Sequence, residues 1–87
     1  MNPTSLLESV VELHTELETS ENVDPEVLEQ ARELDSKMHQ MIKSNELKAE
    51  ESLTEQLLDL EAKFALDHPM LEKLTREVID RLSQMGI

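Results

Sequence analysis

The sequence lacks cysteine, tryptophan and tyrosine, and it has a single phenylalanine and a single glycine. Without cysteine, disulfide bonds and thiolate metal sites are excluded. The only glycine is Gly86, so the chain has no glycine-rich loop that could hold a phosphate group, which excludes nucleotide-binding folds of that kind. No stretch approaches the roughly 20 apolar residues of a membrane-spanning helix.

The N-terminal residues 1–5 form no basic region, and no long apolar region follows them. A secretory signal peptide needs both features, so we expect none and assign the chain to the cytoplasm. With 87 residues, the chain is expected to form a single helical domain over residues 1–87, near the small end of the usual range of domain sizes.

Acidic residues outnumber basic ones by 20 to 8, which gives a net charge of −12. The excess is greatest in residues 1–30, which contain eight acidic residues and no lysine or arginine. Phosphate contacts need clustered lysine and arginine, so direct binding to nucleic acid is excluded. Attraction to anionic membrane surfaces is excluded for the same reason.

Leucine and glutamate are the commonest residues, and turn residues such as glycine and proline are few, which favours helices over strands. Four segments carry apolar residues at alternating spacings of four and three, the pattern of one face of an amphipathic helix. We expect these helices at about residues 5–18, 25–43, 53–67 and 69–85.

Several helix ends have recognisable signals. Ser-x-x-Glu capping boxes occur at residues 5–8 and 52–55. Asp24 followed by Pro25 is a strong start signal, because proline is tolerated at the first helical position. Gly86 lies where a helix C-terminus favours glycine.

Pro69 leaves two interpretations of residues 53–85 open. The residue before a proline avoids the α-helical region, which favours a break at His68 and two separate helices. Alternatively, Pro69 kinks one long helix, whose apolar stripes a dimer partner would then have to cover.

Similar helix lengths and short connections predict an all-α fold, an antiparallel bundle of four short amphipathic helices. The residues expected in its core are Leu13, Leu17, Leu34, Leu57, Phe64, Leu74 and Val78. The apolar stripes are wider than four helices can cover in a thin core, which predicts that dimerisation completes the bundle. The flanking residues that widen them are Leu7, Val11, Leu28, Ile42, Leu58 and Ile79.

The two ends of the chain resemble a known family. Phe64, the pair His68-Pro69 with Leu71, and the C-terminal residues 85–87 (Met-Gly-Ile) are similar to the end of the bacterial family called domain of unknown function 4404. Residues 13–18 (Leu-His-Thr-Glu-Leu-Glu) resemble the opening helix of that family. The resemblance spans essentially the whole chain and implies a bacterial, cytoplasmic, small helical protein, without implying an activity.

The three histidines, His14, His39 and His68, are the candidates for acid–base chemistry near neutral pH. No two of them share a helix at a spacing of four residues, and no His-Glu-x-x-His motif occurs. We therefore expect the protein to have no metal, no cofactor and no enzymatic activity. The alternative is a zinc site formed by His14, His39 and added carboxylates.

The acidic residues Glu8, Glu12 and Glu16 follow one another at four-residue spacing on the first expected helix. The simplest interpretation is a solvated face that keeps the protein soluble. The functional interpretation is a face that binds a partner protein with a basic surface, which would make the chain a non-catalytic interaction module. The alternative function is an acidic inhibitor, a nucleic-acid mimic that occupies a basic protein surface.

Overall fold

The computed structural model describes residues 3–44 and 51–85, and over these ranges the chain forms four α-helices and no strand. Helix α1 spans Pro3–Thr19, α2 spans Pro25–Lys43, α3 spans Glu51–Asp67 and α4 spans Pro69–Gln84. The predicted all-α class and the predicted number of helices are confirmed over the described part of the chain.

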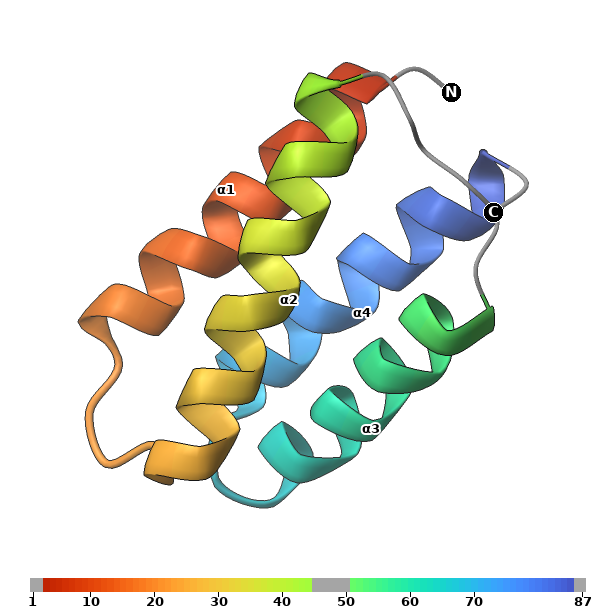
Figure 1. Ribbon diagram of the computed structural model, residues 1–87. Coiled ribbons are helices and arrows are strands. Elements are labelled where there is room, and N and C mark those ends of the chain that lie inside the picture. Colours follow the sequence, from red (N-terminus) through yellow and green to blue (C-terminus); the bar gives the residue numbers. More distant parts are fainter. Residues whose placement is uncertain (1–2, 45–50, 86–87) are drawn as a thin grey trace.

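Successive helices run in opposite directions along the molecule (Figure 1). Contacts join α1 to α2, α2 to α3, α3 to α4 and α4 to α1. Between their described residues, α1 does not contact α3 and α2 does not contact α4. The helices therefore stand at the four corners of an antiparallel bundle, the predicted architecture, with α1 and α3 at opposite corners.

Pro69 separates two helices and does not kink a single one. Helix α3 ends at Asp67, and His68 takes a non-helical conformation, with φ −135° and ψ 73°. Its position before proline explains this, because the proline ring disfavours the α region for the preceding residue. Since α4 turns back to pack against α3, the two-helix interpretation of residues 53–85 is the correct one.

The start of α2 follows the sequence signal closely. The side chain of Asp24 accepts a hydrogen bond of 2.9 Å from the backbone N–H of Glu26, and Pro25 occupies the first helical position. Two residues earlier, Asn22 has a φ of 61°, in the left-handed region that asparagine tolerates better than most residues. Together these residues make the tight connection between α1 and α2.

The two capping-box predictions are wrong about where their helices begin. Helix α1 begins at Pro3 and α3 at Glu51, so Ser5 and Ser52 lie inside the first turn and not before it. Proline suits the first helical position, which allows α1 to start earlier than Ser5. The predicted C-terminal role of Gly86 lies outside the described residues.

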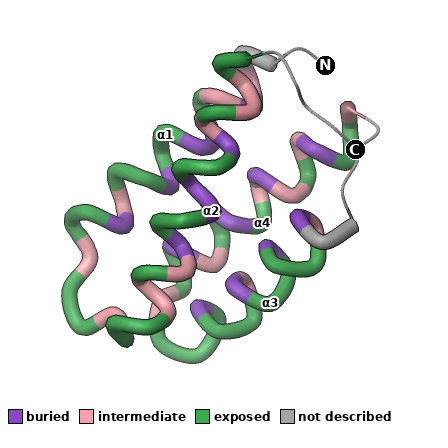
Figure 2. Tube along the Cα trace, in the orientation of Figure 1, coloured by how far each residue is buried: buried purple, intermediate pink, exposed green. Residues whose placement is uncertain are grey.

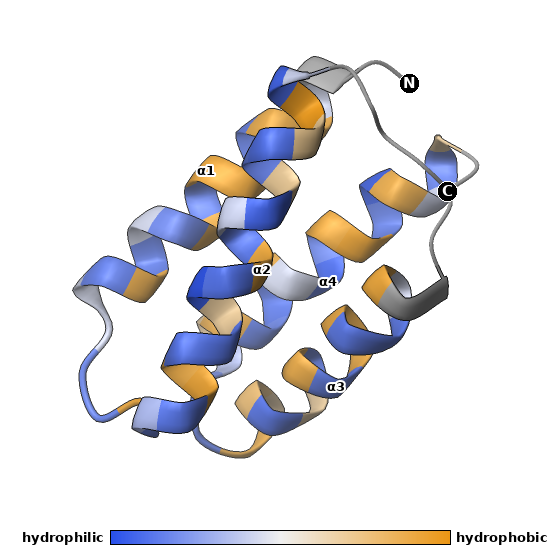
Figure 3. Ribbon diagram, viewed as in Figure 1, coloured by the Kyte–Doolittle hydropathy of each residue, from blue (hydrophilic) through white to orange (hydrophobic). Residues whose placement is uncertain are grey.

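The core lies on the axis of the bundle, where the inward faces of all four helices meet (Figure 2). Figure 3 shows the same division by hydropathy, with hydrophobic bands that alternate with hydrophilic ones along every helix. Phe64, the only aromatic residue of the core, is fully buried. All seven residues predicted for the core are buried, and so are Leu6, Val10, Ala31, Met38, Leu53, Leu60, Leu71 and Leu82.

The residues that widen the stripes have different environments. Leu28, Ile42 and Ile79 pack against the core, and Leu7 is half-buried. Val11 and Leu58 remain exposed, and two residues not predicted to be exposed, Leu66 and Met70, join them. None of the described helices is long and apolar enough to cross a membrane.

Candidate functional site

The acidic residues of α1 reach solvent to different extents. Glu8 and Glu12 are exposed one turn apart, whereas Glu16 is half-buried. The hydroxyl of Ser20 donates a hydrogen bond of 2.7 Å to the backbone carbonyl of Glu16 and lies 3.4 Å from its carboxylate. Of the three acidic residues Glu8, Glu12 and Glu16, only Glu8 and Glu12 are therefore exposed.

No positive charge compensates these two carboxylates within the described part of the chain. Helix α1 contains no lysine or arginine, and no ion pair links Glu8 or Glu12 to any described residue. Further along α1, Glu18 does have a partner, Arg32 of α2, at 3.4 Å. Like charges one turn apart repel by a few tenths of a kcal/mol, so Glu8 and Glu12 form a locally uncompensated negative site.

Apolar side chains lie next to this negative site. A shallow depression of about 400 Å³ is lined by Leu7, Glu8, Val11 and Glu12, and the side chain of Val11 is 45% exposed within it. A second depression, of about 250 Å³, shares Leu7 and continues onto α2, where its lining residues are His39, Ile42 and Lys43. The surface beside Glu8 and Glu12 is therefore hollowed and partly apolar.

Two histidines meet a buried carboxylate between α1 and α2. His14 Nδ1 lies 2.8 Å from Asp35 Oδ2, and His39 Nε2 lies 3.8 Å from Asp35 Oδ1. The two imidazole rings are edge-to-face, with centroids 6.3 Å apart. Asp35 is only 4% exposed, and its Oδ1 atom has no hydrogen-bond partner. The His14 contact is thus the one hydrogen bond that satisfies this buried carboxylate.

The sequence analysis paired His14 with His39 but did not identify Asp35 as their shared partner. The burial of Asp35 did have a signal in the sequence, because Asp35 lies four residues after Ala31 and three before Met38, on the inward side of α2. In residues 3–44 and 51–85, no group of three histidine or acidic side chains is arranged to hold a metal ion. The cluster therefore forms a polar contact between α1 and α2.

His68 occupies the N-cap position of α4, as predicted, but its side chain makes no capping hydrogen bond. Its ring instead packs edge-to-face on the buried ring of Phe64, with centroids 6.3 Å apart. The turn between α3 and α4, which contains this histidine, lies at the opposite end of the bundle from the start of α1, so His68 takes no part in the acidic surface of α1 (Figure 1).

Charged side chains also connect α3 to its two neighbours. Arg76 of α4 contacts Glu61 of α3 at 3.2 Å and also pairs with Glu72 on its own helix. A hydrogen bond that protonated Glu61 donates to the Glu72 carboxylate, together with burial, raises the pKa of Glu61, and the same bond lowers the pKa of Glu72. These three groups are engaged with one another across the α3–α4 contact.

A second polar cluster joins α3 to α2. Lys63 Nζ lies 3.0 Å from both Asp59 Oδ2 and Gln30 Oε1, and Gln30 Nε2 donates to Asp59 at 3.3 Å. The hydrogen bonds from Lys63 and then Gln30 lower the pKa of Asp59. Lys63 is therefore not available to compensate the acidic residues of α1.

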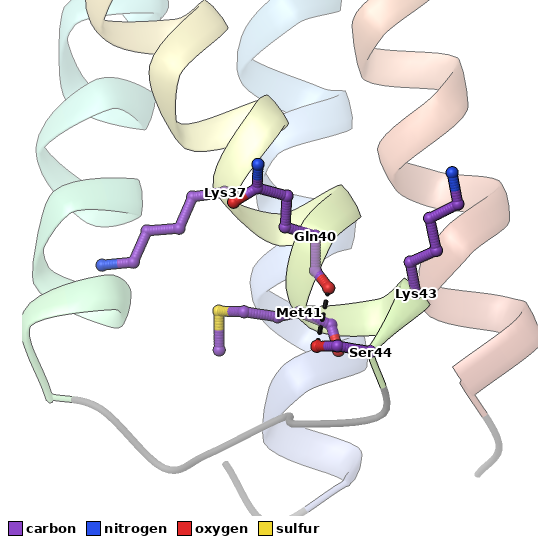
Figure 4. A pocket seen from close by; sticks show the side chains of 5 residues that line it. All are labelled: Lys37, Gln40, Met41, Lys43 and Ser44. Carbon is purple, nitrogen blue, oxygen red and sulfur yellow. Dashed lines mark hydrogen bonds between the residues drawn. The ribbon is translucent and has the colours of Figure 1, made fainter.

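The largest of these depressions lies at the C-terminal end of α2 and measures about 640 Å³ (Figure 4). Its lining residues are Lys37, Gln40, Met41, Lys43 and Ser44. In Figure 4 the two lysine side chains leave α2 in different directions, so their ammonium groups do not converge on a common point. The hydroxyl of Ser44 is engaged with the backbone carbonyl of Gln40 at 2.8 Å. This arrangement has no convergent polar groups of the kind that fix a small ligand.

By its fold and its charge, the chain is a small acidic four-helix bundle with antiparallel neighbours. The family model described as "Domain of unknown function (DUF4404)" matches residues 6–87, and the chain therefore belongs to that family. The resemblance seen at both ends of the sequence is confirmed by this match. No curated protein and no solved structure matches the chain.

Proposed function

We propose that the protein is a non-catalytic interaction module of the bacterial cytoplasm, which binds a partner protein with a basic surface. The binding surface is the α1 face, defined as Leu7, Glu8, Val11 and Glu12. The observation that carries the proposal is the exposed pair Glu8 and Glu12, which no cation in the described part of the chain compensates.

The α1 face has the composition expected of a small protein interface. Interfaces place apolar contacts at the centre and charged groups at the rim. Here Val11 is exposed between two carboxylates, and Leu7 is half-buried beside it. A partner that presents lysine or arginine on both sides of an apolar side chain would relieve the repulsion between Glu8 and Glu12 and cover Val11.

The arrangement of acids favours this module over a nucleic-acid mimic. A mimic needs its acidic residues along one continuous exposed face. On α1 the exposed run stops after Glu12, because Glu16 is half-buried and Glu18 pairs with Arg32. Two carboxylates are enough to orient a basic partner but are too few to imitate a phosphate backbone.

We propose a non-catalytic role because of the side chains that surround His14 and His39. His14 is oriented by the buried Asp35, as the base of a catalytic triad is, and a triad also needs a side-chain nucleophile within hydrogen-bond distance of that base. Among the described residues, no hydroxyl group is hydrogen-bonded to His14 or His39. The carboxyl pair Glu61 and Glu72 is likewise engaged with Arg76.

Site-specific crosslinking tests the α1 face directly. A photo-reactive amino acid in place of Val11, in the full chain, is irradiated in a lysate of the source cells, and mass spectrometry identifies the crosslinked protein. We expect a protein with a basic surface. Glu8→Lys/Glu12→Lys should abolish its capture, because the charge complementarity is reversed.

The matched control is Glu29→Lys/Asp80→Lys, which makes the same change in net charge at exposed positions on α2 and α4. This variant should still capture the same protein. Equal capture by the α1 variant, or equal loss in both variants, would contradict the proposal, because the binding would then not depend on the position of the charges.

A further inference from the structure

The hollowed surface of the α1 face continues onto α2. Its two depressions, of about 400 Å³ and about 250 Å³, share Leu7, and the second is lined on α2 by His39, Ile42 and Lys43. Leu7 and Ile42 are half-buried, so each presents part of an apolar side chain to this surface. We call Leu7, Val11, His39, Ile42 and Lys43 the α1–α2 groove.

The two sides of the groove carry opposite charges. Glu8 is exposed beside Leu7 and Val11 on α1, and Lys43 is exposed on α2. In Figure 4 the side chain of Lys43 lies on the α1 side of α2, and it lines the same depression as Leu7. Within the described part of the chain, no ion pair joins Lys43 to an acidic residue. A partner therefore meets a negative charge on one side of the groove and a positive charge on the other.

The groove suits a helix better than other binding elements of a partner. A peptide that adds a strand needs the edge of a sheet, and residues 3–44 and 51–85 contain no strand. A proline-rich peptide needs a groove lined with aromatic side chains, but the chain has no tryptophan or tyrosine and its one phenylalanine is fully buried. An amphipathic helix needs an apolar groove, and the α1–α2 groove has one.

The arrangement of the depressions matches one face of a helix. Side chains four residues apart lie about 6 Å from each other on the same face of a helix, so two apolar ones can enter two depressions that meet at Leu7. The flanks of that helix then lie over the two sides of the groove. Lysine or arginine on one flank would face Glu8, and aspartate or glutamate on the other would face Lys43.

We propose that the α1–α2 groove binds an amphipathic helix of the partner protein. Two aliphatic side chains of this helix, four residues apart, occupy the depressions, its basic flank faces Glu8 and its acidic flank faces Lys43. This inference rests on the proposed function, because the α1 face forms one side of the groove. It adds the kind of element that the partner presents and a second contact on α2.

Titration with a synthetic peptide tests the groove. The probe is an alanine-based peptide of about 20 residues, long enough to form a helix in water, with two leucines four residues apart, lysine along one flank and glutamate along the other. Amide resonances of the isotope-labelled full chain report where the probe binds. We expect the largest shifts at the residues of the α1–α2 groove and no comparable shifts on α3.

A charge reversal on α2 separates this helix from a ligand that is merely basic. Lys43→Glu should weaken binding of the probe by roughly tenfold, because the acidic flank then meets a like charge. A second probe, with lysine in place of the glutamates on that flank, should regain the affinity for this variant. Lys73→Glu, which makes the same change in net charge at an exposed position on α4, is the matched control and should leave the binding of the first probe unchanged.

Three results would overturn the proposal: no binding of the probe, shifts that lie outside the groove, or equal effects of Lys43→Glu and Lys73→Glu. The first would also be seen if a second copy of the chain already filled the groove. The proposed function would survive each of them if the protein captured through position 11 is still lost in Glu8→Lys/Glu12→Lys. Binding of the probe in the groove with no capture through position 11 would instead contradict the proposed function.

Discussion

Phe64 is the single residue on which the core depends most. It is the only phenylalanine in a protein without tyrosine or tryptophan, and it is fully buried. Its ring packs against the ring of His68, the N-cap residue of α4. We expect Phe64→Ala to lower the free energy of unfolding by about 3–5 kcal/mol, because it removes apolar contacts and leaves a cavity. Urea denaturation measures this difference, and a loss below about 1 kcal/mol would contradict the burial of the ring.

Asp35 is the most unusual residue, because a buried carboxylate depends on one hydrogen bond from His14. His14→Ala leaves that carboxylate with only His39, 3.8 Å away, and we expect it to cost about 1–3 kcal/mol. The double variant His14→Ala/Asp35→Leu should regain stability, because an apolar side chain replaces the unsatisfied group. Urea denaturation of both variants decides the point: a double variant no more stable than His14→Ala would exclude this account of the cluster.

The limits of sequence analysis are clearest at residues of this kind. Every core residue that was predicted from the periodicity of apolar residues is buried in the structure. The periodicity suffices for these positions because apolar residues on the inner face of a helix repeat every three or four residues. Asp35 follows the same period but is charged, and its burial depends on His14, 21 residues away in the sequence. Because the two residues are far apart in the sequence, no local pattern of residues predicts that they contact each other.

The starts of α2 and α4 were predicted well from the sequence. Pro25 and Pro69 begin α2 and α4, as expected from the fixed φ angle of proline. The starts of α1 and α3 were less accurate, because a serine three residues before a glutamate suits the interior of a first turn as well as a cap. The exposed apolar row on α3 was only partly anticipated, through Leu58, because packing decides which flank remains uncovered.

The contact between α3 and α4 should depend on pH through Glu61. Its pKa is raised in the folded chain, so the folded state holds a proton more tightly than the unfolded state. The stability that this group provides is present below the ordinary glutamate pKa and is lost as the pH rises through the raised value. Glu61→Gln cannot ionise and escapes this loss.

Thermal unfolding from about pH 4 to about pH 7 measures the effect. The midpoint of Glu61→Gln, relative to wild type, should rise across this range. Glu55→Gln, at an exposed glutamate on the same helix, controls for the loss of one negative charge. The account would be contradicted if the unfolding midpoint of Glu61→Gln, relative to wild type, stayed constant or fell as the pH rises. The proton would then not be held between Glu61 and Glu72.

At the scale of the whole molecule, exposed apolar residues lie on three of the described helices, with Val11 on α1, Leu58 and Leu66 on α3 and Met70 on α4. Helix α1, which carries Glu8 and Glu12, lies at the opposite corner of the bundle from α3 (Figure 1). Repulsion between exposed charges is largely screened beyond about 8 Å at physiological salt. The charges of Glu8 and Glu12 therefore contribute more to the attraction of a basic partner at the α1 face than the charges of α3 do.

The central claim is that the charge of Glu8 and Glu12 drives partner binding, and calorimetric titration over a range of salt concentrations tests it most directly. The partner captured through position 11 should bind more weakly as salt rises, because exposed charge pairs are screened. Glu8→Gln/Glu12→Gln should reduce that salt dependence, and Glu29→Gln/Asp80→Asn should leave it unchanged. Binding that does not respond to salt, or that responds equally in both double variants, would contradict the claim.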